Sequence, residues 1–240
     1  MIKIEKLVKT YGNHIRAVDG LDFTVRNGEI LGFIGPNGAG KTTTIKMMTG
    51  ILKPDSGNVM INDYSMRTQA LKAKQEIGYI ADSPDLFLRL KGIEYLNLIS
   101  DIYGVSTKDR KERIKEFAGR FDMLEALGDA MQNYSHGMRQ KIMVIGALVH
   151  NPAVWILDEP LTGLDPKSAF ALKQMMREHA DAGNSVFFST HVLEVAEKLC
   201  DRVIIINHGK KLFDGSIETL RENRKEEDLE KIFLEMTAYE

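Results

Sequence analysis

Residues 35–42 read Gly-Pro-Asn-Gly-Ala-Gly-Lys-Thr, and this stretch decides the fold. Glycine stands at its first and sixth places, followed by lysine and a hydroxyl residue, which is the pattern of a phosphate-binding loop. We expect Gly35, Gly38 and Gly40 to adopt positive φ, because that conformation lets backbone amides approach phosphate oxygens. The apolar run before it, residues 29–34, predicts the buried strand that such a loop follows. The sequence therefore predicts a nucleoside triphosphate site.

The loop also supplies a charge and a metal ligand. Lys41 would lie near the β- and γ-phosphates, and the Thr42 hydroxyl can ligate Mg²⁺. The helix predicted over residues 42–50, beginning near Lys41, directs its positive end toward the same anion. We therefore expect ATP and Mg²⁺ as cofactors. The candidate nucleotide-binding residues of the loop are Gly35, Pro36, Asn37, Gly38, Ala39, Gly40, Lys41, Thr42 and Thr43.

A second nucleotide motif is Ala-Val-Trp-Ile-Leu-Asp-Glu at residues 153–159. An apolar strand that ends in a carboxylate fits the Walker B pattern, in which Asp158 holds Mg²⁺ through its water shell. Glu159 follows directly and is placed to polarise an attacking water. Burying two adjacent carboxylates at the end of a strand costs free energy unless a cation is bound beside them. This also favours a magnesium site.

The coarse layout is that of an α/β protein. An N-terminal antiparallel sheet is expected from alternating segments at residues 2–8 and 17–25. Short apolar runs of the parallel-strand type lie at residues 77–80, 154–157, 185–189 and 203–206, and a further strand is expected at 59–61. Helical periods dominate residues 85–150, most clearly at 94–103, 108–121 and 138–149. A solvated amphipathic helix is expected over residues 221–235.

Net charge, cysteine content and the absence of long apolar runs exclude several classes of protein. The chain has 240 residues and a formal net charge of −2, so its bulk charge gives no reason to expect a nucleic-acid partner. Cys200 is the single cysteine, which fits a reducing compartment and a buried structural thiol. The charged N-terminal residues do not form a signal peptide, and no apolar run reaches the length of a membrane helix. We expect a cytoplasmic protein that is soluble by itself.

Residues 134–140, Tyr-Ser-His-Gly-Met-Arg-Gln, lie one helix upstream of the Walker B strand. Here the chain resembles ABC transporter nucleotide-binding subunits, whose signature reads roughly Leu-Ser-Gly-Gly-Gln. Ser135 and Gly137 are kept, and the version with Met-Arg-Gln resembles bacterial branches that pair with exporter-type membrane subunits. A serine and a free amide at a helix start form an anion site. In the family, this site meets the γ-phosphate held by the other subunit.

The resemblance extends over nearly the whole chain and assigns further residues. Tyr11 matches the aromatic residue that stacks on adenine, and residues 161–165 resemble the loop that touches the partner subunit. His191 matches the switch histidine that hydrogen-bonds the γ-phosphate and aligns the water. The family places Gln after the strand at 77–80, whereas this chain has Asp82 in register. Asp82 still offers a hard oxygen toward Mg²⁺ or the water.

The resemblance implies a P-loop NTPase fold in a single ABC ATPase domain. Residues 1–84 and 151–240 would form the nucleotide-binding core with its β subdomain, and residues 85–150 the helical signature subdomain. It further implies a homodimer or heterodimer of ATPase subunits that drives a separate transmembrane permease. Residues 84–88 and the helical segment would dock on that permease, at the inner face of the membrane. The short segment after residue 215 favours an exporter-type partner.

Two other classes remain open at this point. A soluble ABC-type ATPase acting on nucleic acid, ribosomes or protein assembly would share the same motifs. Such proteins usually carry two cassettes, a long coiled coil or a basic face, and the sequence shows none of these. A P-loop kinase would need neither Ser135 and Gly137 nor His191, and it would phosphorylate a small molecule.

Overall fold

A computed structural model describes residues 1–240 except 13, 84–86, 225–228 and 239–240. Its centre is a six-stranded sheet in the order β10-β9-β3-β8-β7-β6. These strands are β3 (Ile30–Ile34), β6 (Ile77–Ile80), β7 (Val154–Leu157), β8 (Ser185–Thr190), β9 (Arg202–Asn207) and β10 (Lys210–Gly215). All neighbours pair in parallel except β9 and β10, which form an antiparallel hairpin. The α/β class and its parallel strands are as predicted, whereas β10 was not predicted.

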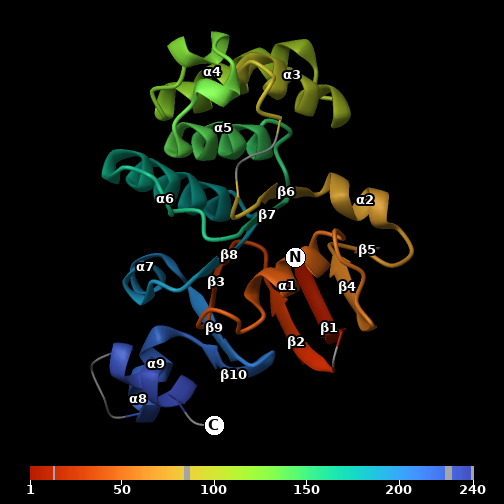
Figure 1. Ribbon diagram of the computed structural model, residues 1–240, viewed down its shortest axis with the longest axis vertical. Coiled ribbons are helices and arrows are strands. Elements are labelled where there is room, and N and C mark those ends of the chain that lie inside the picture. Colours follow the sequence, from red (N-terminus) through yellow and green to blue (C-terminus); the bar gives the residue numbers. More distant parts are fainter. Residues whose placement is uncertain (13, 84–86, 225–228, 239–240) are drawn as a thin grey trace.

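A second, antiparallel sheet lies beside the first (Figure 1). It has the order β2-β1-β4-β5, formed by β1 (Ile2–Tyr11), β2 (Ile15–Val25), β4 (Ser56–Ile61) and β5 (Tyr64–Ser65). Buried apolar residues alternate with more exposed, mostly polar residues along much of β1 and β2, since one face packs on the core and the other faces water. The predicted N-terminal antiparallel sheet is confirmed, with longer strands than expected.

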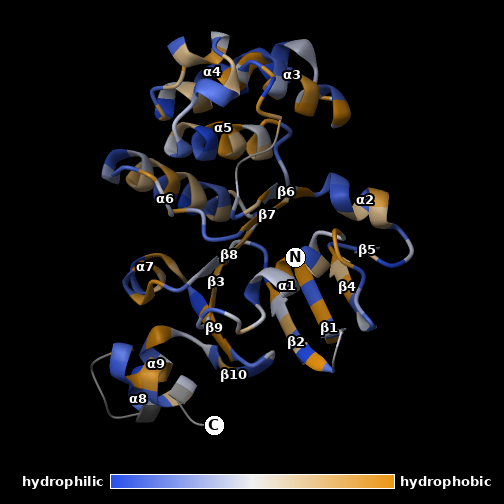
Figure 2. Cartoon of the chain, viewed as in Figure 1, coloured by the Kyte–Doolittle hydropathy of each residue, from blue (hydrophilic) through white to orange (hydrophobic). Residues whose placement is uncertain are grey.

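The parallel strands are hydrophobic throughout because both faces of their sheet are covered (Figure 2). Trp155, Leu157 and Phe188 pack with the helices of residues 92–180 on one face. Their neighbours Ile156 and Phe187 pack on the other face, against the antiparallel sheet and the first helix. Alternate residues of each strand thus pack into two different hydrophobic cores, and this alternation fixes the register of the strand.

Helices account for most of the remaining chain. The predicted helices are present, with ends shifted by up to two residues: α1 (Lys41–Met48), α3 (Gly92–Ile102), α4 (Thr107–Arg120) and α5 (His136–Leu148). The phosphate loop leads directly into α1, whereas α3, α4 and α5 lie together at one end of the molecule (Figure 1). Further elements are α2 (Ala70–Gln75), α6 (Pro166–Asp181), α7 (Leu193–Leu199), η1 (Glu125–Gly128) and η2 (Met131–Asn133).

The C-terminal segment differs from its prediction. Instead of one solvated helix over residues 221–235, the chain forms α8 (Ile217–Arg224) and α9 (Leu229–Ala238). Leu229 and Ile232 are buried against Ile217 and Leu220. The amphipathic pattern was real, but its apolar stripe closes a small core with β9 and α7 rather than facing solvent.

Cys200 follows α7 and packs against the central sheet. A Cβ atom at Gly32 would lie 2.6 Å from its Sγ atom, so the thiol occupies the space above a glycine of β3. Burial raises the pKa of this thiol above its usual range. The thiol therefore remains protonated and contributes packing, as the sequence predicted.

Two histidines are half-buried, and the described residues provide neither with an acidic partner. The ring of His150 stacks on Tyr103 at a centroid distance of 3.7 Å, and its Nε2 lies 3.1 Å from the Ile77 carbonyl oxygen. His179 meets the edge of Trp155. Burial lowers the pKa of each imidazole to about 4. Each ring is thus neutral in the folded protein under conditions in which the unfolded chain binds a proton.

These histidines predict an acid-sensitive fold. Between pH 6.5 and about 4 these histidines bind protons in the unfolded state but stay neutral in the native state. The free energy of unfolding therefore falls as pH falls. Each imidazole contributes on the order of 3 kcal/mol across that window. Denaturant unfolding of His150→Gln should show a weaker pH slope than the wild type, whereas His14→Asn, at an exposed position, should keep it. Equal slopes for His150→Gln and the wild type would contradict this assignment.

Candidate functional site

The carboxyl ends of five parallel strands meet at one edge of the central sheet. The segments that follow β3, β6, β7 and β8 carry Lys41, Asp82, Glu159 and His191, and ligands of open α/β sheets bind at this edge. They surround a cavity of about 350 Å³. Its lining residues are Ala17, Pro36, Asn37, Gly38, Gly40, Lys41, Thr42, Thr43, Asp82, Glu159, Thr162 and His191.

The phosphate loop connects β3 to α1. Gly38 and Gly40 have φ values of +81° and +104°, as expected. Gly35 was predicted to share this conformation but has no positive φ. Glycine is needed there for a different reason, since a Cβ atom would lie 2.5 Å from the Ile206 carbonyl oxygen. The loop is therefore pressed against the end of β9.

Lys41 begins α1 and is buried, with 7% of its surface exposed. Its Nζ atom donates to the carbonyl oxygens of Gly35, at 2.7 Å, and Pro36, at 3.2 Å. It also lies 3.7 Å from Glu159 Oε1. A cation is thus held over the loop, beside the carboxylate that follows β7.

Asp158 directly follows β7 and is fully buried, and its two carboxylate oxygens differ in their hydrogen bonding. The Ser189 hydroxyl donates to Oδ1 at 2.6 Å, whereas Oδ2 is buried without a hydrogen bond among the described residues. Burial raises the pKa of this carboxyl; the Ser189 and Thr42 hydroxyls oppose the rise, and the charges of Asp82 and Glu159 add to it. Burial, together with the charges of Asp158 and Asp82, raises the pKa of Tyr79 to about 12.

Glu159 turns back toward the cavity because its backbone has φ +48°, an uncommon value for this residue. Its amide donates to Ser189 Oγ at 3.0 Å. Its Oε2 lies 3.0 Å from His191 Nδ1, while Oε1 faces Lys41. A carboxylate fixed between an imidazole and a buried ammonium can orient a water as a general base.

The residues present fit a magnesium ion held together with a nucleotide. Asp158 Oδ2 lacks a hydrogen-bond donor, the Thr42 hydroxyl is close by, and both are hard oxygen ligands. Within the described part of the chain no group of three or more His, Cys, Asp or Glu side chains is arranged to hold a metal by itself. Phosphate oxygens and waters would complete the coordination, as is usual for Mg²⁺.

Two residues assigned from the resemblance have different surroundings. Asp82 lines the cavity with Thr42 and Glu159. Tyr11, at the end of β1, is exposed and is not among the lining residues, and Lys9 Nζ lies 5.9 Å from the centroid of its ring. The structure therefore brings Asp82 to the phosphate loop and leaves Tyr11 outside the cavity.

Ser135 and Gly137 also lie away from this cavity, at the start of α5. Ser135 caps the helix, since its Oγ accepts from the Met138 amide at 3.2 Å, and it is exposed. Its hydroxyl proton therefore stays available for an acceptor outside the chain.

The start of α5 packs on residues 160–165 of the same chain. The Gln140 side-chain amide donates to the Pro160 carbonyl oxygen at 3.3 Å, and Lys141 Nζ lies 3.0 Å from Asp165 Oδ2. A Cβ atom at Gly163 would lie 2.4 Å from the His136 ring, so this glycine permits the close approach. The signature segment and the loop after Glu159 are thus joined by direct contacts.

Sequence reasoning missed Ser189 as a site residue. Its hydroxyl joins Asp158 to the Glu159 amide, and it comes from β8, next to β7 in the sheet. It also missed Ala17 and Thr162 in the cavity wall. The position of Ser189 two residues before His191 was the available signal, but only the strand order shows which carboxylate it meets.

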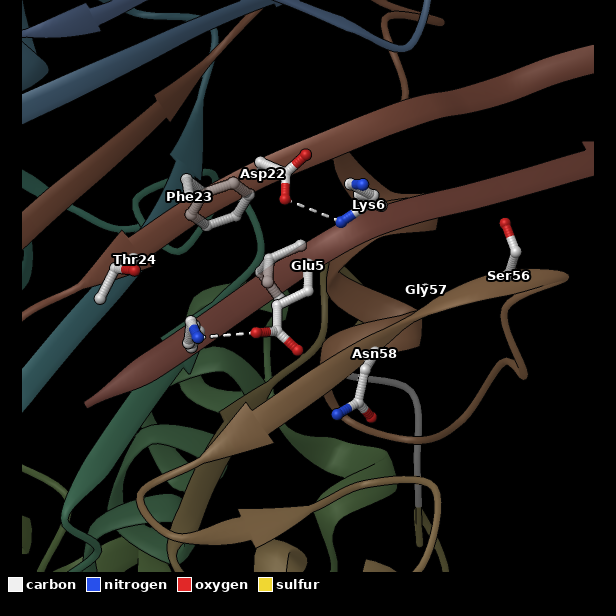
Figure 3. A pocket seen from close by; sticks show the side chains of 10 residues that line it. Glu5, Lys6, Asp22, Phe23, Thr24, Ser56, Gly57 and Asn58 are labelled. Carbon is white, nitrogen blue, oxygen red and sulfur yellow. Dashed lines mark hydrogen bonds and ion pairs between the residues drawn. The ribbon is translucent and has the colours of Figure 1, made fainter.

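A larger hollow, of about 760 Å³, lies on the open face of the antiparallel sheet (Figure 3). The side chains of Lys3, Glu5 and Asp22 already have partners there. Lys3 Nζ lies 2.6 Å from Glu5, and the Lys6 amide donates to Asp22 at 2.9 Å. This shallow surface holds no buried charged side chain, so the smaller cavity at the phosphate loop is the candidate site.

Comparison with known proteins identifies relatives of nearly the whole chain. The family model described as "ABC transporter" matches residues 18–162, more than half of the chain. NatA, an ABC transporter ATP-binding protein of Bacillus subtilis, is 33% identical over 221 residues, covering 92% of this chain and 90% of NatA. The Nod factor export ATP-binding protein I of Cupriavidus metallidurans is 34% identical, covering 90% of this chain and 71% of that protein.

Solved structures show the same architecture. An ATP-binding subunit of an ABC transporter superposes with a TM-score of 0.93 at 30% identity, covering 98% of this chain and 99% of the other. The dimeric cassette MJ0796, in a post-hydrolysis state with ADP and Pi, gives 0.82 at 23% identity, covering 90% and 99%. Because its identity is only 23%, the similarity to MJ0796 shows a shared fold and nothing more. With the phosphate loop, the Walker B carboxylates and the signature segment in place, the chain belongs to the ABC transporter family, as one of its ATP-binding and ATP-hydrolysing subunits.

Proposed function

We propose that this subunit binds ATP with Mg²⁺ at the phosphate-loop cavity and hydrolyses it with Glu159 as general base. The observation that carries the proposal is the convergence of Lys41, Asp158, Glu159 and His191 at one sheet edge. Lys41 would offset charge on the γ-phosphate, and Thr42 and Asp158 would hold the metal, with Asp82 nearby. His191 would orient Glu159 and contact the γ-phosphate. The remaining loop residues would cradle the phosphates through their amides.

We further propose that the chain is one ABC ATPase domain that works as a dimer. Residues 1–84 and 151–240 would form its core and residues 85–150 its helical subdomain. Ser135 and Gly137 lie outside the chain's own cavity and are free to complete the cavity of a second subunit. Every motif is present in this chain, so a homodimer would contain two complete sites. A heterodimer with a homologous subunit would use the same surfaces.

The partner that we propose is a separate transmembrane permease. No helix in the described ranges is both long and apolar enough to cross a membrane. Exposed apolar side chains gather near the predicted docking segment, at Phe87 and, on α3, at Leu98 and Ile102. Pro84, Asp85 and Leu86 of that segment lie outside the described residues. The subunit would then sit on the cytoplasmic face of the membrane, and the name of the Nod factor export relative supports an exporter-type partner.

Affinity purification from native membranes tests this role. The Glu159→Gln variant, captured with Mg-ATP, should co-purify a multi-span membrane protein. Adding Phe87→Ser should reduce that recovery, while Phe170→Ser, an equally exposed apolar position on α6, should not. Recovery of ribosomes, DNA or only soluble proteins would overturn the transport role and keep the ATPase chemistry.

A further inference from the structure

The turn between β9 and β10 touches the back of the phosphate loop. His208 and Gly209 connect the two strands, and both have positive φ, as in the tight turns that suit twisted hairpins. The Gly209 amide donates to the Ala39 carbonyl oxygen of the loop at 3.0 Å. The Gly209 carbonyl oxygen accepts from the Asp19 amide of β2 at 2.9 Å. The backbone of a single residue, Gly209, thus bridges the loop and the antiparallel sheet.

The backbones at this junction are packed without room for a side chain. A Cβ atom at Gly209 would lie 2.8 Å from the Ala17 carbonyl oxygen and 2.9 Å from Val18 Cα. A Cβ atom at Gly40 would lie 2.3 Å from the same oxygen. Because Ala17 lines the nucleotide cavity, the turn contacts both the loop and the cavity wall opposite it.

The other end of the phosphate loop meets the same hairpin. Gly35 lies against the Ile206 carbonyl oxygen, one residue before the turn begins. The loop is therefore supported at its first residue by the end of β9 and at Ala39 by the turn itself. Its conformation depends on where the hairpin lies as well as on its own sequence.

Asn207 connects this hairpin to the C-terminal helix. The residue is buried, with 7% exposed. Its Oδ1 accepts from the His208 amide at 3.1 Å, which orients the turn, and its Nδ2 donates to the Thr237 carbonyl oxygen of α9 at 3.1 Å. Hydrogen bonds thus connect α9 to Asn207, Asn207 to the His208 amide, and, one residue along the backbone, Gly209 to Ala39.

We infer that the turn at residues 207–209 is a positioning element for the phosphate loop, and that Asn207 makes this positioning depend on the docking of α9. The inference rests on the proposed role of the loop in binding ATP. Gly209 and Asn207 touch no nucleotide themselves; they fix the carbonyl of Ala39, and hence the direction of the neighbouring amides that would face the phosphates.

Gly209→Ala tests the inference with Gly183→Ala as its matched control. Gly183, after α6, has φ +88° and no atom within 4 Å of its Cβ position, so it shares the backbone strain but not the contact. Titration with a fluorescent ATP analogue and Mg²⁺ should show about tenfold weaker binding for Gly209→Ala and unchanged binding for Gly183→Ala. Thermal unfolding without nucleotide should show a larger loss of stability for Gly209→Ala, because only this variant adds a backbone clash, so binding is compared at a temperature at which both variants are fully folded.

Two further variants separate the causes. Gly209→Asn tolerates positive φ but adds the same Cβ atom, so it should also weaken binding. Asn207→Ala should weaken binding and speed amide exchange in residues 35–41. If Gly209→Ala and Gly209→Asn bind like Gly183→Ala, the inference is overturned. If the wild type binds no nucleotide, the proposed function fails instead, so the two failures are distinguishable.

Discussion

Glu159→Gln should bind ATP and hydrolyse it at least about a hundredfold more slowly than the wild type, because removal of a general base typically costs 10²–10⁴-fold. The amide keeps the size of the side chain but cannot accept a proton from water. In the folded chain Glu159 Oε2 lies 3.0 Å from His191 Nδ1 and Oε1 lies 3.7 Å from Lys41 Nζ, a pair of contacts that no other carboxylate of the described residues makes. With ATP bound and uncleaved, the variant should accumulate as a dimer.

Single-turnover phosphate release, together with gel filtration in Mg-ATP, measures this expectation. Glu194→Gln is a suitable control, since Glu194 is exposed on α7 and pairs only with Lys198 among the described contacts. That variant should turn over like the wild type. Normal turnover by Glu159→Gln would remove Glu159 from the role of general base.

Lys41→Ala should lose nucleotide affinity by roughly 10- to 100-fold, the effect expected when a hydrogen bond to a charged group is removed. The side chain is buried and directed over the loop, where it donates to two loop carbonyl groups. No other lysine or arginine lines the cavity within the described residues. The phosphates would therefore lose their one nearby side-chain cation.

Lys46→Ala provides the matched control, because Lys46 lies on the same helix but is exposed. It should bind the fluorescent ATP analogue as the wild type does, with equal thermal stability. Equal affinities for Lys41→Ala and Lys46→Ala would argue against the phosphate loop as the nucleotide site.

The short motifs were predictable because their chemistry is local. The spacing of Lys41 and Thr42 after a strand, and of Asp158 and Glu159 after another, follows from how a loop or strand end presents its own residues. The order of the parallel strands was not predictable in this way. Ser189 joins Asp158 to Glu159 only because β8 pairs with β7, and a single sequence does not contain that pairing.

Long-range contacts explain the other differences. Gly35 is required by the Ile206 carbonyl oxygen, which is far away in sequence, so its φ could not be inferred from the loop motif. The amphipathic pattern of the C-terminal segment continues across two helices, and only the core formed with Ile217 and Leu220 shows which residues are buried. Local propensity predicted the elements, and tertiary contacts determined their ends and their burial.

The packing of α5 on residues 160–165 has a thermodynamic consequence for a dimer. Gln140 and Lys141 join the segment that would contact one nucleotide to the loop that carries Glu159 beside the other. A ligand bound at one position would then change the affinity of the other position for its ligand. Such coupling is reciprocal: each ligand changes the binding of the other by the same factor. In a dimer built this way, binding of the first ATP would change the affinity for the second, and a substitution in this packing would alter that coupling.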